Sequence, residues 1–217
     1  MTGDEAVKPA GAILAGGRAL RFGGRPKGLE LIGGVRIIDR VAEALRGVAG
    51  ELLLIGAPPV IAATLPDWRL VPDASPGDGP LGAIVTALGA SGRDALIVAW
   101  DMPFVTAADL RPLLHAPSDA DAVLWESDGR VEPLCGLYRM TALASLAAAF
   151  AAGERSPRAA LGGLRLQLIT RPETDQSSPF ASINTSEQLD AARRAGPGAT
   201  LMQALDPGSI MVLRPRR

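Results

Sequence analysis

Short apolar runs alternate with segments of helical periodicity along the first two-thirds of the chain. Three of these runs, at residues 12–15, 51–56 and 95–100, are bounded by Gly, Pro or Asp and predict buried strands. Apolar residues recur at helical spacing over 37–48, and residues 80–90 predict a second helix with Pro80 in its first turn. Strands that alternate with helices in this way are typical of an α/β fold with a mainly parallel sheet.

The last third of the chain is less regular. Thr106 and Asp109 have the spacing of a helix cap and an acidic first-turn residue. Further along, the pattern predicts strands at 121–125, 132–138 and 165–170 and helices at 140–152 and 185–195. We therefore expect a single domain over residues 1–195. Residues 196–217 contain several Gly and Pro residues and end basic, which predicts a C-terminal tail, either poorly ordered or with an edge strand at 211–213.

Composition excludes several classes of protein. The 217 residues suffice for one sizeable core, and 47% are hydrophobic and 21% charged, as in ordinary globular proteins. A formal net charge of −1 argues against a nucleic-acid-binding surface. The single cysteine, Cys135, cannot form an intramolecular disulfide, which fits a reducing cytosol. We find no signal peptide at the N-terminus and no apolar run of about 18 residues, so we expect a cytoplasmic protein with no membrane partner.

The stretch 14–27, LAGGRALRFGGRPK, follows directly on the first predicted strand and combines glycines with basic residues. It therefore lies at the carboxyl end of that strand, where open α/β sheets bind ligands. Its glycines let the backbone approach a ligand closely, and its arginines and Lys27 supply positive charge. A triphosphate needs both features. The spacing matches neither a P-loop nor a dinucleotide-binding fingerprint, and the alternative is a tight connection with solvated arginines.

The motif residues of this stretch are Leu14, Ala15, Gly16, Gly17, Arg21, Gly23, Gly24 and Lys27. Their pattern resembles the signature of the molybdenum cofactor guanylyltransferase family, within the larger superfamily of nucleotidyltransferases. Two positions depart from it, because Phe22 stands where Met is usual and Pro26 where Asp is usual. Pro before the Lys is common elsewhere in the superfamily, so Pro26 bears on the substrate and not on the reaction class.

Later segments extend the resemblance over residues 11–193. Asp73 together with residues 79–82 resembles the family's Asp followed by Gly-Pro-Leu-Ala-Gly, and residues 101–104 resemble its metal-site Asp-x-Pro-Tyr/Phe. Residues 132–138 resemble the segment that faces the acceptor, and residues 183–185 resemble the late Asn-Thr motif. One family position is missing. The second strand usually ends in a polar residue, often Asn, that contacts the base or ribose. Here it ends at Gly56, and backbone groups at Gly56 or Ala57 are the alternative contact.

The resemblance implies a Rossmann-like three-layer α/β/α sandwich with a mostly parallel sheet, as in nucleotide-diphospho-sugar transferases. It also implies transfer of GMP from GTP to molybdenum-molybdopterin, which yields the guanine dinucleotide cofactor and pyrophosphate. Mg²⁺ is the implied cofactor, with nucleotide in the N-terminal half and pterin in the C-terminal part. The implied partners are the enzyme that inserts molybdate and the chaperones or apoenzymes that receive the product.

The nucleotide site implied by the family consists of Leu14, Ala15, Gly16, Gly17, Lys27, Asp73 and Asp101. Lys27 is expected to neutralise charge at the transferred phosphate, and the alternative is a solvated surface lysine. Asp101 is expected to bind Mg²⁺ at the end of a buried strand, and the alternative is a turn or cap residue. No catalytic base is expected, because the attacking terminal phosphate is already ionised at neutral pH.

For the remaining candidate side chains, the sequence allows either two alternative roles or only a surface or packing role. Asp73 either contacts the guanosine or shapes the proline-rich turn that follows it. Arg21 and Asn184 are candidates to contact the acceptor or a phosphate, and Asn184 is equally a candidate to cap the final helix. His115, Cys135 and the three tryptophans are expected to have surface or packing roles.

Two rival functions remain open. A related transferase with another base or acceptor, such as the molybdenum cofactor cytidylyltransferase or a sugar-phosphate nucleotidyltransferase, often carries Leu-Ala-Ala-Gly in the first loop. The Gly16-Gly17 pair here favours guanine. A non-catalytic nucleotide-binding assembly protein is suggested only by Pro26 and the missing Asn, and the presence of both Lys27 and Asp101 argues against it.

Overall fold

The computed structural model describes residues 8–16, 21–22, 25–116, 119–127, 129–170 and 178–195. A seven-stranded sheet forms its centre, in the order β11-β9-β10-β8-β1-β6-β7. The strands are β1 (Ala10–Leu14), β6 (Leu52–Ile55), β7 (Arg69–Val71), β8 (Ala95–Ala99), β9 (Ala122–Ser127), β10 (Arg130–Tyr138) and β11 (Leu166–Thr170). Neighbouring strands are parallel except where β10 pairs with β8 and β9, so the sheet is mostly parallel, as predicted.

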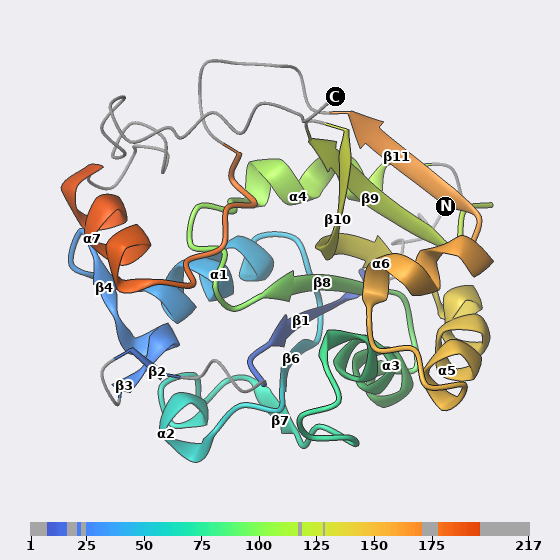
Figure 1. Ribbon diagram of the computed structural model, residues 1–217, viewed down its shortest axis with the longest axis horizontal. Coiled ribbons are helices and arrows are strands. Elements are labelled where there is room, and N and C mark those ends of the chain that lie inside the picture. The colour runs from blue at the N-terminus through green and yellow to red at the C-terminus, as the bar shows by residue number, and fades with distance from the viewer. Residues whose placement is uncertain are drawn as a thin grey trace, which may run out of the picture.

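Helices cover both faces of this sheet (Figure 1). α1 (Ile37–Arg46) and α4 (Ala107–Leu114) pack together on one face, while α3 (Pro80–Ser91), α5 (Leu143–Ala151) and α6 (Pro157–Ala160) pack on the other. One apolar cluster fills the space beneath each helix layer. The predicted Rossmann-like α/β/α sandwich is therefore confirmed.

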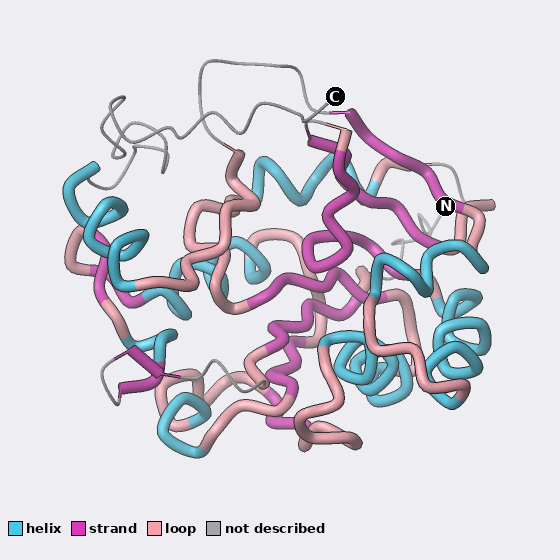
Figure 2. Tube along the Cα trace, viewed as in Figure 1, coloured by secondary structure: helices cyan, strands magenta, loops and turns pink. Residues whose placement is uncertain are grey.

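The central strands lie in the middle of the sheet because their side chains are apolar on both faces. All five residues of β1 and all five of β8 are buried, as a strand covered by helices on both sides requires. The helices begin at the predicted signals. Pro80 opens α3, and Thr106 precedes α4, where its main-chain N–H and its hydroxyl both donate to Asp109 Oδ2. Along the chain, a helix separates each of the sheet strands β1, β6, β7 and β8 from the next. Figure 2 shows the sheet strands in magenta between cyan helices.

Smaller elements lie outside the sandwich. The 3-10 turn η1 (Lys27–Leu29) packs on α1, and β4 (Leu31–Ile32) forms a hairpin with β5 (Val35–Arg36). α7 (Ser186–Ala195) lies beside β4 (Figure 1), and a third apolar cluster joins the two. The end of the described chain is thereby brought back to the segment that carries Lys27.

The sequence pattern does not predict several of the short elements. These are β7, α2 (Pro59–Ala62), α6, the pair β2 (Arg21–Phe22) and β3 (Arg25–Pro26), and the hairpin of β4 and β5. Each has two to four residues, too few to display a hydrophobic period. The helix predicted over 140–152 begins as a 3-10 turn, Met140–Ala142, which leads into α5. The predicted tail at 196–217 lies outside the described residues, and the domain extent over 1–195 stays a prediction.

Candidate active site

Four strand ends at one edge of the sheet carry residues singled out from the sequence. Gly16 follows β1, Gly56 follows β6, Asp73 follows β7 and Asp101 follows β8, and these strands are parallel neighbours. After β1 the chain passes to α1 on one face of the sheet, and before β8 it returns through α3 on the other. The crevice outside the carboxyl ends of β1 and β8 is therefore a topological switch point, where open α/β sheets bind ligands.

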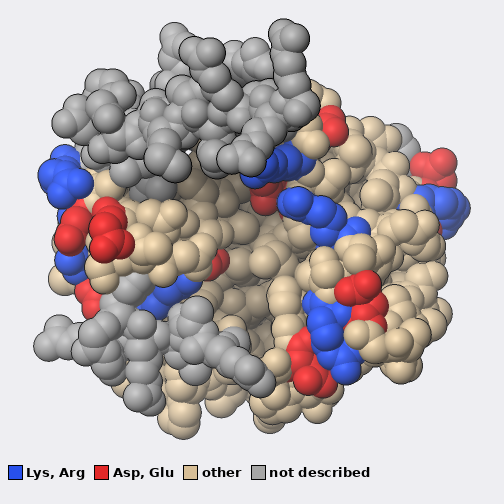
Figure 3. Space-filling model, in the orientation of Figure 1, with Lys and Arg blue, Asp and Glu red and all other residues tan. Residues whose placement is uncertain are grey.

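A cavity of about 360 Å³ occupies this crevice. Figure 3 shows this face of the molecule hollowed at its centre, over the ends of β1 and β8. The lining residues are Leu14, Gly16, Asp73, Gly77, Gly79, Pro80, Ala83, Ala99, Trp100, Asp101 and Leu134. The amino-terminal end of α3 belongs to this wall, and the partial positive charge of a helix amino terminus favours an anion there.

Lys27 places its ammonium group between two side-chain oxygens beside this cavity. Its Nζ donates to Asp101 Oδ2 and to Asn184 Oδ1, at 2.8 Å in each case. Lys27 is only 3% exposed, so the alternative of a solvated surface lysine is wrong. A buried ammonium is costly without partners, and here a carboxylate and an amide oxygen supply them. We call Lys27, Asp101 and Asn184 the Lys27 cluster.

Asn184 is held in this cluster by main-chain contacts on both sides. Before it, Ile183 donates its N–H to the carbonyl of Asp101 at 2.9 Å. After it, Gln188 Oε1 accepts the N–H groups of Asn184 and Thr185 at 2.7 and 3.0 Å, while Thr185 Oγ1 accepts the N–H of Gln188. Thr185 therefore caps α7, and the interpretation of Asn184 as the cap is wrong. Its amide oxygen contacts Lys27 instead.

Asp73 lies against two glycines at the β6 and β7 side of the cavity. Gly56 has a φ of +66°, and a Cβ there would lie 3.1 Å from Asp73 Cβ and 3.3 Å from Gly16 Cα. This left-handed backbone and the lack of space explain why a glycine stands where a polar residue is usual. Asp73 Oδ1 accepts the N–H of Ser75 at 3.0 Å, and Asp73 also lines the cavity. The turn-forming role is thus present, and the guanosine contact remains a prediction.

Trp100, for which the sequence indicates only a packing role, lies between the segment that carries Lys27 and the cavity. Its ring is so close to Gly28 that a Cβ there would stand 2.8 Å from Trp100 Cε3 and 2.9 Å from Cζ3. Trp100 is buried and lines the cavity. Because Gly28 follows Lys27 and Trp100 precedes Asp101, this contact sets how closely the two charged residues approach. A tryptophan at the end of an apolar strand gives no sequence signal for such a role.

β10 supplies another wall of the cavity through a bulge. Its ladder with β9 shifts register across residues 133–135. The hydroxyl of Tyr138 donates to the carbonyl of Pro133 at 2.7 Å, and Leu134 lines the cavity. Burial raises the pKa of the Cys135 thiol well above its ordinary value, so this thiol stays protonated, which agrees with its predicted packing role.

The family model for the MobA-like NTP transferase domain matches residues 11–167. The chain belongs to this family. A probable molybdenum cofactor guanylyltransferase of Chloroflexus aggregans is 37% identical to this MobA-like transferase over 161 residues, or 71% of this chain and 77% of that protein. The molybdenum cofactor guanylyltransferase of Desulfosudis oleivorans is 30% identical over 199 residues, or 85% of this chain and 94% of that protein.

A solved structure shows the same fold. The crystal structure of molybdopterin-guanine dinucleotide biosynthesis protein A from Archaeoglobus fulgidus matches this MobA-like transferase with a TM-score of 0.69 and 23% identity. The match covers 85% of this chain and 97% of that chain, so nearly all of that structure has a counterpart here. Among the helices that the structure describes, none is long and apolar enough to cross a membrane.

The structure brings most of the predicted site residues of this MobA-like transferase together. Of those predicted from the sequence, Leu14, Gly16, Asp73 and Asp101 line the cavity, Ala15 is buried next to Gly16, and the Lys27 ammonium donates to both Asp101 and Asn184. Gly17 and the side chain of Arg21 lie outside the described residues, so their predicted roles stay predictions. His115 is exposed where α4 ends, as expected for a surface role.

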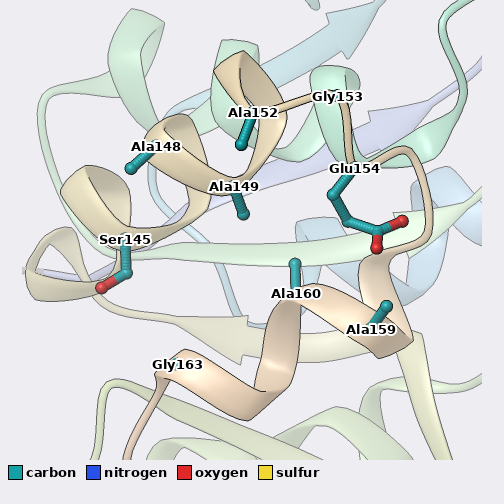
Figure 4. Close-up of a pocket in the computed structure, with 9 residues that line it drawn as sticks. All are labelled: Ser145, Ala148, Ala149, Ala152, Gly153, Glu154, Ala159, Ala160 and Gly163. Atoms are coloured by element: carbon teal, nitrogen blue, oxygen red, sulfur yellow. The ribbon is translucent and has the colours of Figure 1, made fainter.

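A second hollow of about 650 Å³ lies between α5 and α6 (Figure 4). Ala and Gly make up most of its lining, and Glu154 is the one ionisable side chain among the nine residues that line it. Glu154 Oε1 accepts the N–H groups of Ser156 and Arg155 at 2.7 Å each, which lowers the pKa of this carboxyl. Because Glu154 is engaged by these two N–H groups and no second ionisable side chain stands among the nine lining residues, this hollow is a weaker candidate active site than the switch-point cavity.

The Lys27 cluster has the oxygen donors that Mg²⁺ prefers. Asp101 offers a carboxylate and Asn184 an amide oxygen, and the cavity that Asp101 lines has room for phosphate oxygens and water. Three or more His, Cys, Asp or Glu side chains do not come together anywhere in the described part of the chain. The donor set therefore fits one Mg²⁺ held by few protein ligands together with its substrate, as is usual for this ion.

Proposed function

We propose that this MobA-like transferase moves GMP from GTP to molybdenum-molybdopterin, forming molybdopterin guanine dinucleotide and releasing pyrophosphate. The observation that carries the proposal is the Lys27 cluster, a buried ammonium held by Asp101 and Asn184 beside the switch-point cavity. The guanylyltransferase names of the relatives in C. aggregans and D. oleivorans support these two substrates.

The terminal phosphate of the acceptor supplies the nucleophile. One of its oxygens forms a bond to the α-phosphorus of GTP. The bond between that phosphorus and the bridging oxygen of the β-phosphate breaks, and pyrophosphate leaves with the electron pair. The attacking phosphate is already ionised at neutral pH, so no side chain has to remove a proton. Catalysis therefore depends on alignment and on charge neutralisation.

Lys27 is the group best placed to neutralise charge. Its ammonium would stabilise the negative charge that builds on the α-phosphate and the leaving pyrophosphate. Because the residue is buried, its field is screened less by water than that of a surface lysine. Asp101 and Asn184 hold the ammonium in position before substrate binds, and they are also the residues that would hold Mg²⁺. The chemistry that Mg²⁺ would supply there is neutralisation of negative charge on the phosphates.

Asp73 is the residue we propose for base recognition. Guanine presents an N–H and an amino group side by side, and a carboxylate can accept from both. The glycines beside Asp73 leave space for a purine, since neither carries a side chain into the cavity. A base without these two donors would cover the half-buried carboxylate without satisfying it, which costs about 2–4 kcal/mol.

We also propose a cytoplasmic location and two kinds of partner. The single, buried cysteine fits a reducing compartment. The acceptor must already contain molybdenum and the product must reach an apoenzyme. The enzyme that inserts molybdate and the chaperones of molybdoenzymes are therefore the partners we expect.

A panel of nucleotides tests the proposal. The protein is incubated with Mg²⁺, molybdenum-molybdopterin and GTP, CTP, ATP or UTP in turn, and pyrophosphate release and product mass are measured. We expect turnover with GTP to exceed that with CTP by about 30-fold or more. Equal or better turnover with CTP would indicate a cytidylyltransferase, and GTP binding without pyrophosphate release from any nucleotide would indicate a non-catalytic protein.

A further inference from the structure

The turn that joins α5 to α6 contacts the loop that joins β7 to α3. Arg155 in this turn has its Nη2 3.5 Å from Oδ2 of Asp78. Asp78 lies between Gly77 and Gly79, and both of these glycines line the nucleotide cavity. Gly79 has a φ of +88°, and a Cβ there would lie 3.2 Å from the carbonyl oxygen of Arg155. The backbone of the loop is therefore seated closely on the α5–α6 turn.

The same segment also contacts the β10 side of the cavity. Arg158 in α6 donates from Nη2 to the carbonyl of Val131 at 2.8 Å. Val131 belongs to β10, the strand that places Leu134 in the cavity lining. Two arginines three positions apart thus hold two different walls of one cavity. Figure 3 shows Lys and Arg side chains beside the central hollow, on the side of α3 and α6.

Arg155 is fixed in place by its own surroundings. Its guanidinium lies 4.3 Å from the centre of the Phe150 ring, and its Nη1 donates to the carbonyls of Phe150 and Glu154 at 2.9 Å each. Phe150 packs against Gly82 of α3, where a Cβ would lie 3.0 Å from Phe150 Cε2. The guanidinium is therefore held next to the loop without help from a ligand.

The loop itself has few other polar anchors. Among the residues that the structure describes, two contacts tie residues 74–78 to other elements. One joins the N–H of Ala74 to Thr86 Oγ1 at 3.4 Å, and the other is the Arg155–Asp78 pair. A loop with so few ties needs each of them to stay in one conformation.

We propose that Arg155 and Arg158 are positioning residues that fix the two walls of the nucleotide cavity and thereby set the affinity for GTP. Arg155 acts through Asp78 and Arg158 through the backbone of β10, and neither arginine lines the cavity. This inference rests on the proposed function, because it takes GTP as the ligand of the cavity. The Arg155–Asp78 pair is partly exposed, so each change should weaken GTP binding moderately, by about 3- to 10-fold.

A double-mutant cycle on GTP binding tests the inference. The dissociation constant for GTP is measured by titration calorimetry with Mg²⁺ for wild type, Arg155→Met, Asp78→Asn and the double variant. Met keeps a stem over Phe150 and removes the charge. We expect each single change to weaken binding, the double variant to be no weaker than the worse single one, and Arg155→Lys to recover part of the affinity. Arg158→Met should also weaken binding.

The matched control is Arg69→Met. Arg69 also pairs with a carboxylate, Glu51, at 2.8 Å and donates to a main-chain carbonyl, that of Ala90, but it stands at the start of β7 and does not line the cavity. The Arg69→Met variant should have a lower melting temperature and an unchanged affinity for GTP.

Weak GTP binding in Arg155→Met together with normal GTP binding in Asp78→Asn would overturn the route through Asp78. Unchanged binding in both arginine variants would overturn the whole inference, whereas a wild type that binds no GTP would contradict the proposed function itself.

Discussion

At the scale of single residues, the reaction centre depends on side chains that need one another. Lys27 is buried and its ammonium is satisfied by Asp101 and Asn184. The side chain of Asp101 is 15% exposed, so this pair is poorly screened by water. Removing the charge of either partner leaves the other in an unfavourable environment. Function and local stability are therefore linked at this site.

Asp101→Asn should lower Mg²⁺-dependent turnover by roughly 100-fold or more, because the proposed metal ligand loses its charge. The variant should remain folded, although the free energy of unfolding should fall by about 1–3 kcal/mol, since Lys27 stays buried beside a neutral amide. The measurement is turnover as a function of Mg²⁺ concentration. Asp94→Asn is the control, because Asp94 precedes the same strand at its other end and pairs with Arg139. Near-normal turnover of Asp101→Asn at limiting Mg²⁺ would show that the metal is held elsewhere.

Gly28→Ala should lower kcat/KM by about 10-fold or more, because the added methyl has no space beside Trp100 and must displace Lys27 or the indole. Gly89→Ala is the matched control, since a Cβ at Gly89 meets nothing within 4 Å. Adding Trp100→Phe to Gly28→Ala should recover part of the activity by making room. Full activity in Gly28→Ala would mean that this contact does not position Lys27.

At the scale of elements, the sequence predicts those parts of the site that belong to regular strands and helices. β1 and β8 are recognisable as apolar runs and α1 and α3 by their helical pattern, and the ends of the two strands place Gly16 and Asp101 at one edge of the sheet. The contact of Asn184 with Lys27 spans 157 positions and depends on the packing of α7 against β4, which no local pattern contains. The bulge of β10 and the Trp100 contact depend likewise on tertiary packing. Only the family resemblance indicated that Asn184 mattered.

Gln188→Ala tests whether the start of α7 positions Asn184. The change removes the side-chain acceptor for two main-chain N–H groups, so the helix cap should weaken by about 0.5–2 kcal/mol and Asn184 should lose its fixed position. We expect kcat to fall about 5-fold or more with little change in the affinity for GTP, measured by steady-state kinetics and calorimetry. Gln167→Ala in β11 is the same substitution away from the site and should be neutral. An unchanged kcat would indicate that the Ile183–Asp101 bond alone positions Asn184.

At the scale of the whole molecule, a separate polar contact connects the start of β9 with the start of β11. Oδ2 of Asp121 accepts from the main-chain N–H and from Nε of Arg165, and Oδ1 accepts from Nη2 at 2.8 Å. The parallel ladder between β9 and β11 begins next to this contact, and in it Val123 lies opposite Gln167. The Arg165 hydrogen bonds, side-chain ones first, hold the pKa of the Asp121 carboxyl well below its usual range. This contact stabilises the fold and takes no part in the chemistry proposed here.

Asp121→Asn should lower the free energy of unfolding at neutral pH by about 1.5 kcal/mol. This value is at the low end for a hydrogen bond to a charged group, because the Arg165 side chain is 66% exposed and water screens the pair. The pKa of Asp121 is depressed in the folded state. Its stabilisation is therefore present above the unfolded pKa of about 4 and is lost as pH falls below that value. Urea unfolding from pH 7 to 3 should show the difference between wild type and variant shrink below about pH 4. A difference in unfolding free energy that does not change with pH would contradict this assignment. The turnover of Asp121→Asn should stay normal.

The central claim is that the chain transfers GMP intact from GTP to a phosphorylated pterin. Its most direct test is a single-turnover reaction of the protein with Mg²⁺, molybdenum-molybdopterin and GTP labelled in the α-phosphate, with all products separated and counted. The account predicts that the label appears in the pterin dinucleotide in equal amount with the pyrophosphate released, and that the pyrophosphate carries none. Label that stays in GTP, or that is released as free GMP or GDP, would contradict it.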